Sequence, residues 1–193
     1  DYLFPGVVAM NLLFASFLAA ISIIWDREFG FLKEMLVAPI SRLTIAVGKA
    51  ASGATVALLQ GCIVLLFIPI LGIETDGWSV LLALPAMFLI AFPMTSLGLL
   101  IASRMTSFEG FGTIANFVIM PMFFLSGAIF PMEQVPPFLK VFSAINPLTY
   151  GVDLLRYILQ GTHAFPVALS IAVLLGFTSL TLAGAVWAFY RRS

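Results

Sequence analysis

The chain has 193 residues, of which 62% are hydrophobic and only 9% are charged, and its nine basic residues balance its nine acidic ones. A soluble domain is about half apolar and about a quarter charged, so this composition indicates an integral membrane protein. The zero net charge argues against a nucleic-acid partner. The single cysteine, Cys62, excludes an internal disulfide, and no Cys/His cluster suggests a metal site.

Long apolar segments predict an all-α fold, a polytopic membrane helical bundle. A helix needs about 20 mostly apolar residues to cross a bilayer. Five segments are read as spans, at residues 3–24, 44–71, 79–102, 109–130 and 165–190. The chain begins with Asp1 and has no basic region before its first apolar run, so we expect a fragment without a signal peptide.

A few polar side chains interrupt these spans. They are Asn11 and Ser22 in the first span, Gln60 in the second and Asn116 in the fourth. Polar groups at this depth commonly form hydrogen bonds between packed helices. They are also the candidates for lining a translocation path, and both interpretations stay open at this point.

A charged connector at 26–38 follows the first span. On a single helix its apolar side chains share one face, and all but one of its charges lie on the other side. Pro39 is expected to end this helix and Ser41 to cap the next one. An amphipathic helix of this kind either lies among lipid head groups or docks on a partner protein.

Four short motifs give the chain a family resemblance. WDREFG at 25–30 and LVAPISR at 36–42 resemble the cytoplasmic loop of ABC-2 type transporter permeases, the membrane subunits of ABC exporters for drugs, polysaccharides and lipids. FLSGAIFP at 124–131 and NPLTY at 146–150 extend the resemblance in the same order. It covers nearly the whole chain, which implies one transmembrane domain over 1–193. Family members have six spans, so the first is expected to be missing here.

The resemblance implies that the connector is a coupling helix that docks a separate ATPase subunit. That subunit would hold ATP and magnesium, leaving no cofactor on this chain. A second permease copy, identical or not, would complete the transporter. The residues implied in docking are Arg27, Glu28, Phe29, Gly30, Phe31, Leu32, Glu34, Met35 and Leu36.

The outer segment at 131–164 contains several prolines and a helix too short to cross the bilayer, so it is predicted to be re-entrant. Asp153 and Arg156 are three residues apart on one helical face and are predicted to form an ion pair. A local structural pair is the simpler interpretation. The resemblance implies short helices that cap the path, with Asn146, Tyr150, Asp153 and Arg156 as a possible outer gate.

The basic residues predict the orientation. If the first residue lies outside, the outer segments hold only Lys140 and Arg156. The inner segments then hold Arg27, Lys33, Arg42, Lys49, Arg104, Arg191 and Arg192. Because basic residues favour the cytoplasmic side, this predicts a multi-pass inner-membrane protein with a cytoplasmic C-terminus.

The sequence predicts a transport subunit rather than an enzyme. Gly48-Lys49 is followed by Ala50 and lacks the glycine spacing of a phosphate-binding loop. An intramembrane hydrolase would depend on Ser126 and the lone His163. We expect an ATP-driven exporter of an amphipathic drug or lipid-like substrate. The alternatives are export of a polysaccharide or lipid-linked glycan, or an ion-coupled carrier, which is disfavoured because the spans contain few acids.

Overall fold

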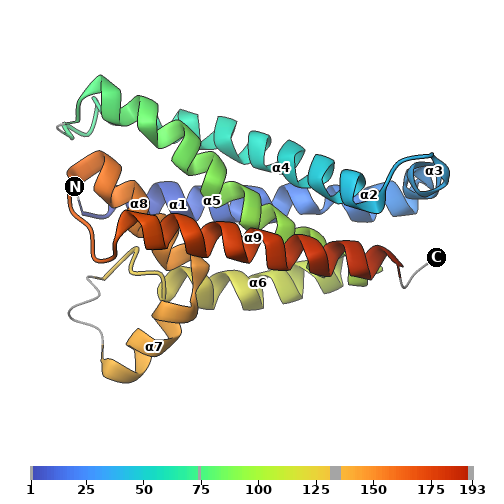
Figure 1. The fold of residues 1–193 in the computed structure, drawn as a ribbon. Coiled ribbons are helices and arrows are strands. Elements are labelled where there is room, and N and C mark those ends of the chain that lie inside the picture. The colour runs from blue at the N-terminus through green and yellow to red at the C-terminus, as the bar shows by residue number, and fades with distance from the viewer. Residues whose placement is uncertain (1, 74, 131–135, 191–193) are drawn as a thin grey trace.

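A computed structural model describes residues 2–73, 75–130 and 136–190. Within these residues the chain forms nine helices, which confirms the predicted all-α bundle (Figure 1). They are α1 (Phe4–Ala20), α2 (Ser22–Glu28), α3 (Phe31–Val37), α4 (Arg42–Leu65), α5 (Gly77–Arg104), α6 (Phe108–Phe124), α7 (Pro137–Ile145), α8 (Pro147–Gln160) and α9 (Val167–Tyr190).

Four helices in the described part of the chain are long and apolar enough to cross a membrane. They are Phe4–Glu28, in which α2 continues α1, followed by Arg42–Leu65, Gly77–Arg104 and Val167–Phe189. The fifth predicted span, 109–130, corresponds to α6, which has only 17 residues. It ends at Phe124 because the chain then turns, and Gly127 adopts a positive φ of 73°.

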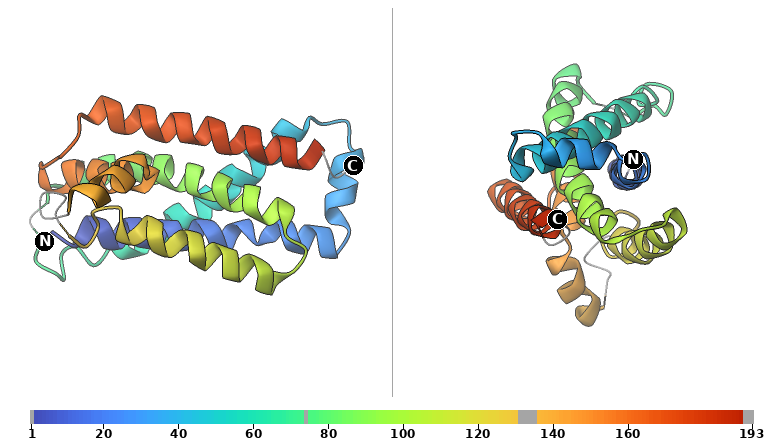
Figure 2. Two further views of the ribbon diagram at one scale, coloured as in Figure 1. Left: turned by 90° about the horizontal axis from the view of Figure 1, so that it is seen from below. Right: turned by 90° about the vertical axis from the view of Figure 1, so that its right-hand side faces the viewer.

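The helix α5 lies in the middle of the bundle and packs against α1, α4 and α9 (Figures 1 and 2). Small residues permit this close packing. A Cβ atom added at Gly98 of α5 would lie only 2.7 Å from the Cβ of Ala20, and one added at Gly53 of α4 would lie 2.5 Å from Thr95. Small side chains at such positions let the helix backbones approach closely, as in other membrane bundles.

Polar residues begin several helices as N-caps. The Ser41 hydroxyl accepts a hydrogen bond from the Thr44 amide at 3.1 Å, as predicted for the start of α4. Asp76 accepts from the Ser79 amide at the start of α5. Hydrogen bonds from the Ser79 side chain and backbone lower the pKa of the Asp76 carboxyl below its ordinary value, so this cap keeps its charge to a lower pH than an ordinary aspartate.

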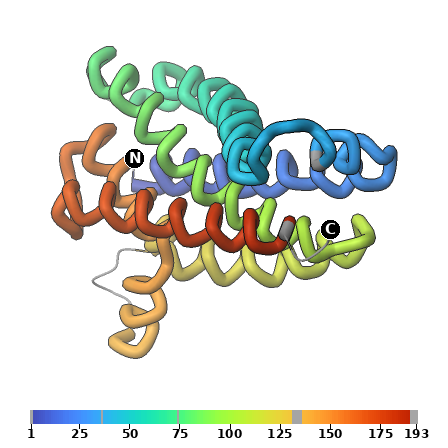
Figure 3. Tube along the Cα trace, turned by 45° about the vertical axis from the view of Figure 1, so that its right-hand side comes forward, coloured from blue at the N-terminus to red at the C-terminus, as the bar shows by residue number. Residues whose placement is uncertain are grey.

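The predicted single helix over 26–38 is divided into two. The helix α2 ends at Glu28, Gly30 adopts a left-handed conformation with φ of 79°, and α3 begins at Phe31. Glycine enters this conformation without the steric cost that a Cβ atom imposes. The charged residues 26–28 therefore extend the first long helix, and only α3 lies across the end of the bundle (Figure 3).

The two ends of the bundle carry different structures. The helices α7 and α8 lie at the end where α1 begins, and α3 lies at the end where α9 finishes (Figures 1 and 2). Several sequence-predicted features fall outside the described residues, namely 131–135 of the outer segment, the basic pair Arg191 and Arg192, and the side chain of Leu36.

Candidate functional site

The apolar side chains predicted for docking point in two directions. Leu32 is buried at 6% exposure, and Met35 packs partly buried against the core. Phe29 and Phe31 are 75% and 51% exposed, and the neighbouring Val37 is 86% exposed. One part of the predicted face therefore fixes α3 to the bundle, and another part remains available at the surface. Glu28, Lys33 and Glu34 are also exposed.

Arg27, also predicted for docking, contacts its own chain instead. Its guanidinium donates to the backbone carbonyl of Ser103 at 2.9 Å and to that of Met105. These carbonyls lie where α5 ends, and the last carbonyl groups of a helix have no partner within the helix. A cation at this position also interacts favourably with the helix dipole. Arg27 is therefore a C-terminal cap for α5.

Arg42 has the same role for α9. It begins α4, and its guanidinium donates to the carbonyl of Phe189 near the end of α9. Close by, the Arg104 guanidinium lies 4.7 Å from the centre of the Trp187 ring. The segment from α2 to α4 is thus bonded to the ends of both α5 and α9. Sequence reasoning assigned neither cap, because each joins residues that are far apart in the chain.

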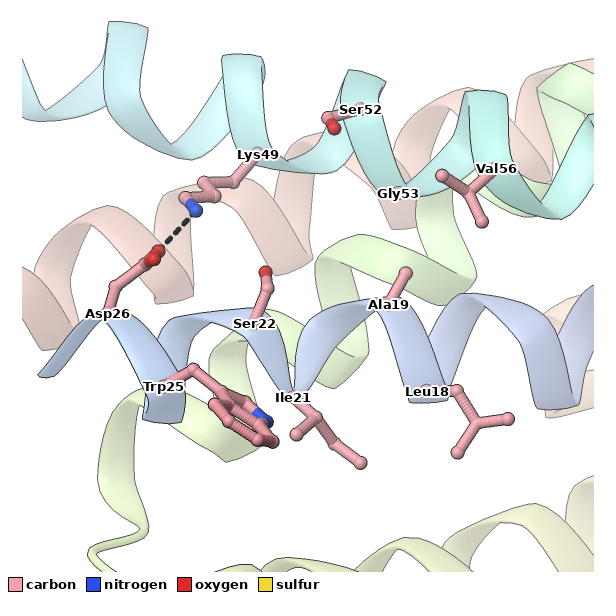
Figure 4. A pocket seen from close by; sticks show the side chains of 10 residues that line it. All are labelled: Leu18, Ala19, Ile21, Ser22, Trp25, Asp26, Lys49, Ser52, Gly53 and Val56. Carbon is pink, nitrogen blue, oxygen red and sulfur yellow. Dashed lines mark ion pairs between the residues drawn. The ribbon is translucent and has the colours of Figure 1, made fainter. Parts of the chain in front are cut away.

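A cleft of about 430 Å³ separates the first long helix from α4 near the α3 end (Figure 4). Asp26 of α2 and Lys49 of α4 point toward each other across it and form an ion pair. Ser22 also points into the space between the helices. At the other end of the cleft, away from the ion pair, the lining is apolar. The remaining lining residues are Leu18, Ala19, Ile21, Trp25, Ser52, Gly53 and Val56.

The four polar residues predicted to line a path do not form one site in this chain. Ser22 lines the cleft, whereas Gln60 on α4 and Asn116 on α6 are exposed on separate helices. Asn11 is half-buried in α1, and its Oδ1 atom is buried without a hydrogen-bond partner among the described residues.

At the opposite end, the predicted gate residues all lie in or next to the buried helix α8. Asn146 caps α8 by accepting from the Leu148 amide at 3.0 Å, and its side-chain amide donates to the Met122 carbonyl of α6 at 2.6 Å. The Tyr150 hydroxyl donates to the Ala144 carbonyl at 2.8 Å, which joins α8 to α7. These residues hold short helices together.

The predicted ion pair between Asp153 and Arg156 is wrong. The two Asp153 carboxylate oxygens accept from the backbone amides of Ala164, at 2.7 Å, and Phe165, at 3.1 Å. The Arg156 guanidinium donates to the Gly127 carbonyl at 3.1 Å and lies 4.1 Å from the centre of the Tyr2 ring. The carboxylate is thus occupied by the α8–α9 loop, and the guanidinium by segments before α1 and after α6.

Sequence reasoning missed the roles of Tyr2 and Gly127. The Tyr2 hydroxyl donates to the Gly127 carbonyl at 3.2 Å, so one carbonyl receives both Tyr2 and Arg156. Gly127 lies in the FLSGAIFP motif, and its left-handed conformation is one that glycine favours. The glycine in this motif was the feature of the sequence that could have indicated a turn whose carbonyl accepts hydrogen bonds from other segments.

The helical bundle with four candidate spans defines a multi-pass membrane protein. Residues 1–159 match the family model described as ABC-2 type transporter. The chain therefore belongs to the ABC-2 type transporter family, which confirms the resemblance found in the sequence.

Named relatives are transport permeases or a nodulation protein. Nodulation protein J of Rhizobium leguminosarum bv. viciae is 31% identical over 175 residues, covering 90% of this chain and 67% of that protein. The inner membrane transport permease YadH of Escherichia coli K12 is 26% identical over 182 residues, covering 92% and 69%. The putative transport permease ycf38 of Cyanophora paradoxa is 28% identical over 160 residues, covering 82% and 55%. The chain spans about half to two thirds of the length of the curated relatives it matches.

The cap formed by Arg27 predicts a measurable loss of stability. Arg27→Met removes the donors to Ser103 and Met105 and should lower the free energy of unfolding by about 2 kcal/mol, the scale of a charge-assisted hydrogen bond. Arg27→Lys should be intermediate, because an ammonium lacks the planar fork of arginine. Thermal unfolding in detergent measures the effect. Lys33→Met at an exposed position is the matched control, and equal losses in both variants would contradict the capping role.

The separate partners of Asp153 and Arg156 predict that their variants do not rescue each other. Asp153→Asn weakens the contact with the Ala164 and Phe165 amides, and Arg156→Gln weakens the contact with Gly127. The double variant should therefore be less stable than either single variant, because each change removes contacts with a different segment. A double variant more stable than either single one would instead show that the two charges depend on each other.

Proposed function

We propose that this chain is the membrane subunit of an ATP-driven exporter and that α3 docks a separate ATPase subunit. The observation that carries the proposal is the division of the apolar face of α3. Leu32 holds the helix to the bundle, while Phe31 and Val37 stay exposed at the end of the molecule, next to the charged Lys33 and Glu34. Exposed aromatic residues surrounded by charges are typical of a protein interface.

Movement of α3 would reach the bundle through polar contacts as well as apolar packing. Arg27 joins the α3 end to α5, Arg42 joins it to α9, and the pair of Asp26 with Lys49 joins α2 to α4. On this proposal, closure of two ATPase subunits on ATP pushes α3, and these contacts transmit the push to the spans. ATP and magnesium are held by the partner, and this chain does no covalent chemistry.

The proposal places the α3 end in the cytoplasm and the α7–α8 end outside the inner membrane. The basic residues Arg27, Arg42, Lys49 and Arg104 all lie toward the α3 end, which supports this orientation. A second permease copy completes the transporter, and α8, with Asn146, Tyr150, Asp153 and Arg156, caps the outer end of the path. Apolar, phenylalanine-rich spans suit an amphipathic drug or lipid as cargo better than a bare sugar.

The docking proposal is tested by reversing the surface chemistry of α3. Glu28→Arg combined with Phe31→Asp should abolish co-purification of an ATPase, because an unpaired charge buried in the interface costs about 3–5 kcal/mol. The ATPase is identified by mass spectrometry from its phosphate-binding loop. Phe138→Asp on α7, where Phe138 is 64% exposed, is the matched control at the opposite end. Normal co-purification of the α3 variant, at equal expression, would contradict docking through α3.

The orientation is tested by labelling single cysteines in intact cells. In a Cys62→Ser background, Thr162→Cys should react with an impermeant maleimide, and Glu34→Cys should react only after the membrane is opened. Both positions are exposed, Thr162 in the loop between α8 and α9 and Glu34 on α3. Labelling of Glu34→Cys from outside would reverse the orientation and exclude docking of a cytoplasmic ATPase on α3.

A further inference from the structure

We propose that the cleft between the first long helix and α4 binds one phospholipid with a zwitterionic head group, of the phosphatidylethanolamine type. The head group lies at Asp26 and Lys49, and an acyl chain lies along the apolar end of the cleft beside Leu18 and Val56. The inference requires only that these helices span a membrane. It does not depend on the ATPase or on the cargo.

The ion pair is placed where a ligand that enters the cleft meets it. Asp26 and Lys49 come from opposite walls of the cleft and meet across it (Figure 4). Their side chains keep 17% and 21% of their surface accessible, although the Asp26 Oδ2 atom that faces Lys49 is buried, so a ligand in the cleft reaches the pair through the rest of these two side chains. They lie near the α3 ends of two helices that are long and apolar enough to cross a membrane, which is the level where the head groups of a bilayer spanned by these helices would lie.

The signs of the two charges favour a zwitterionic head group. The cleft presents one carboxylate and one ammonium, so its charges balance. An anionic lipid would satisfy Lys49 but would bring a second negative charge beside Asp26. A zwitterionic head group supplies a phosphate for Lys49 and a cation for Asp26, so that both charges of the ion pair gain a partner of opposite sign. Ethanolamine has N–H donors that form charge-assisted hydrogen bonds with a carboxylate, whereas choline has none.

The shape of the cleft also suits a phospholipid. At Gly53, α4 touches the neighbouring helices so closely that an added Cβ would lie 3.1 Å from the Cβ of Ala19. This contact closes the floor of the cleft. Leu18 and Val56 on the two walls remain 63% and 44% exposed and can pack against a hydrocarbon chain. A charged end and an apolar end within about 430 Å³ match the two parts of a phospholipid near its glycerol region.

Trp25 lines the cleft, so its fluorescence reports directly on lipid binding there. With Trp78→Phe and Trp187→Phe, Trp25 is the remaining tryptophan. The protein is reconstituted in phosphatidylcholine vesicles that contain a minor fraction of lipid with brominated acyl chains, which quench indole fluorescence. Brominated phosphatidylethanolamine should quench Trp25 with a relative binding constant about fivefold above that of brominated phosphatidylglycerol or phosphatidylcholine, which corresponds to about 1 kcal/mol.

Variants of the ion pair test whether the cleft causes the preference for phosphatidylethanolamine. Asp26→Asn combined with Lys49→Met leaves neither charge stranded and should remove the preference for phosphatidylethanolamine. Lys33→Met, at the same end but outside the cleft, should keep it. Equal quenching by all three head groups in the parent would overturn the proposal and leave the ion pair as a link between α2 and α4. A preference that survives in the double variant would also overturn it.

Discussion

The carbonyl groups at the ends of membrane helices need hydrogen-bond donors, and this requirement organises the α3 end of the molecule. The hydrocarbon core of a bilayer supplies no donors, and the last carbonyls of a helix have no intrahelical partner. Here Arg27 supplies donors at the end of α5, and Arg42 supplies one near the end of α9. Both arginines belong to the segment around α3, so satisfying the ends of two spans also fixes that segment to them.

The opposite end meets the same requirement with side chains from α8. Asp153 accepts from two amides in the loop that leads into α9, and Arg156 donates to the Gly127 carbonyl in the turn after α6. Neither charge has a salt-bridge partner among the described residues, and the peptide groups take that role. A buried charge that is hydrogen-bonded to peptide groups remains tolerable without a counter-ion, which explains how α8 can be buried with both residues on it.

Hydropathy and the positions of proline and capping residues were sufficient to predict an all-α membrane bundle, but not the break at Gly30, the short α6 or the partners of the charged side chains. Apolar length located the long helices, and Ser41 was correctly assigned as a cap because its signal is local. Spacing of three residues suggested a pair of Asp153 with Arg156, yet spacing says nothing about amides and carbonyls brought in from other helices. Likewise, an amphipathic pattern shows that Leu32 and Phe31 are apolar, but it does not say which of them faces the protein's own core.

The break at Gly30 changes how a force on α3 would travel. A continuous helix from 26 to 38 would act as a lever on the first span, whereas a left-handed glycine between α2 and α3 makes a weak mechanical link. The mechanical connection between α3 and the bundle must then come from tertiary contacts. Leu32 is buried and Met35 packs against the core, and Arg42, which follows α3 in the chain, bonds to the Phe189 carbonyl of α9. A push on the exposed face of α3 would therefore act on spans distant in sequence as directly as on the helix that precedes it.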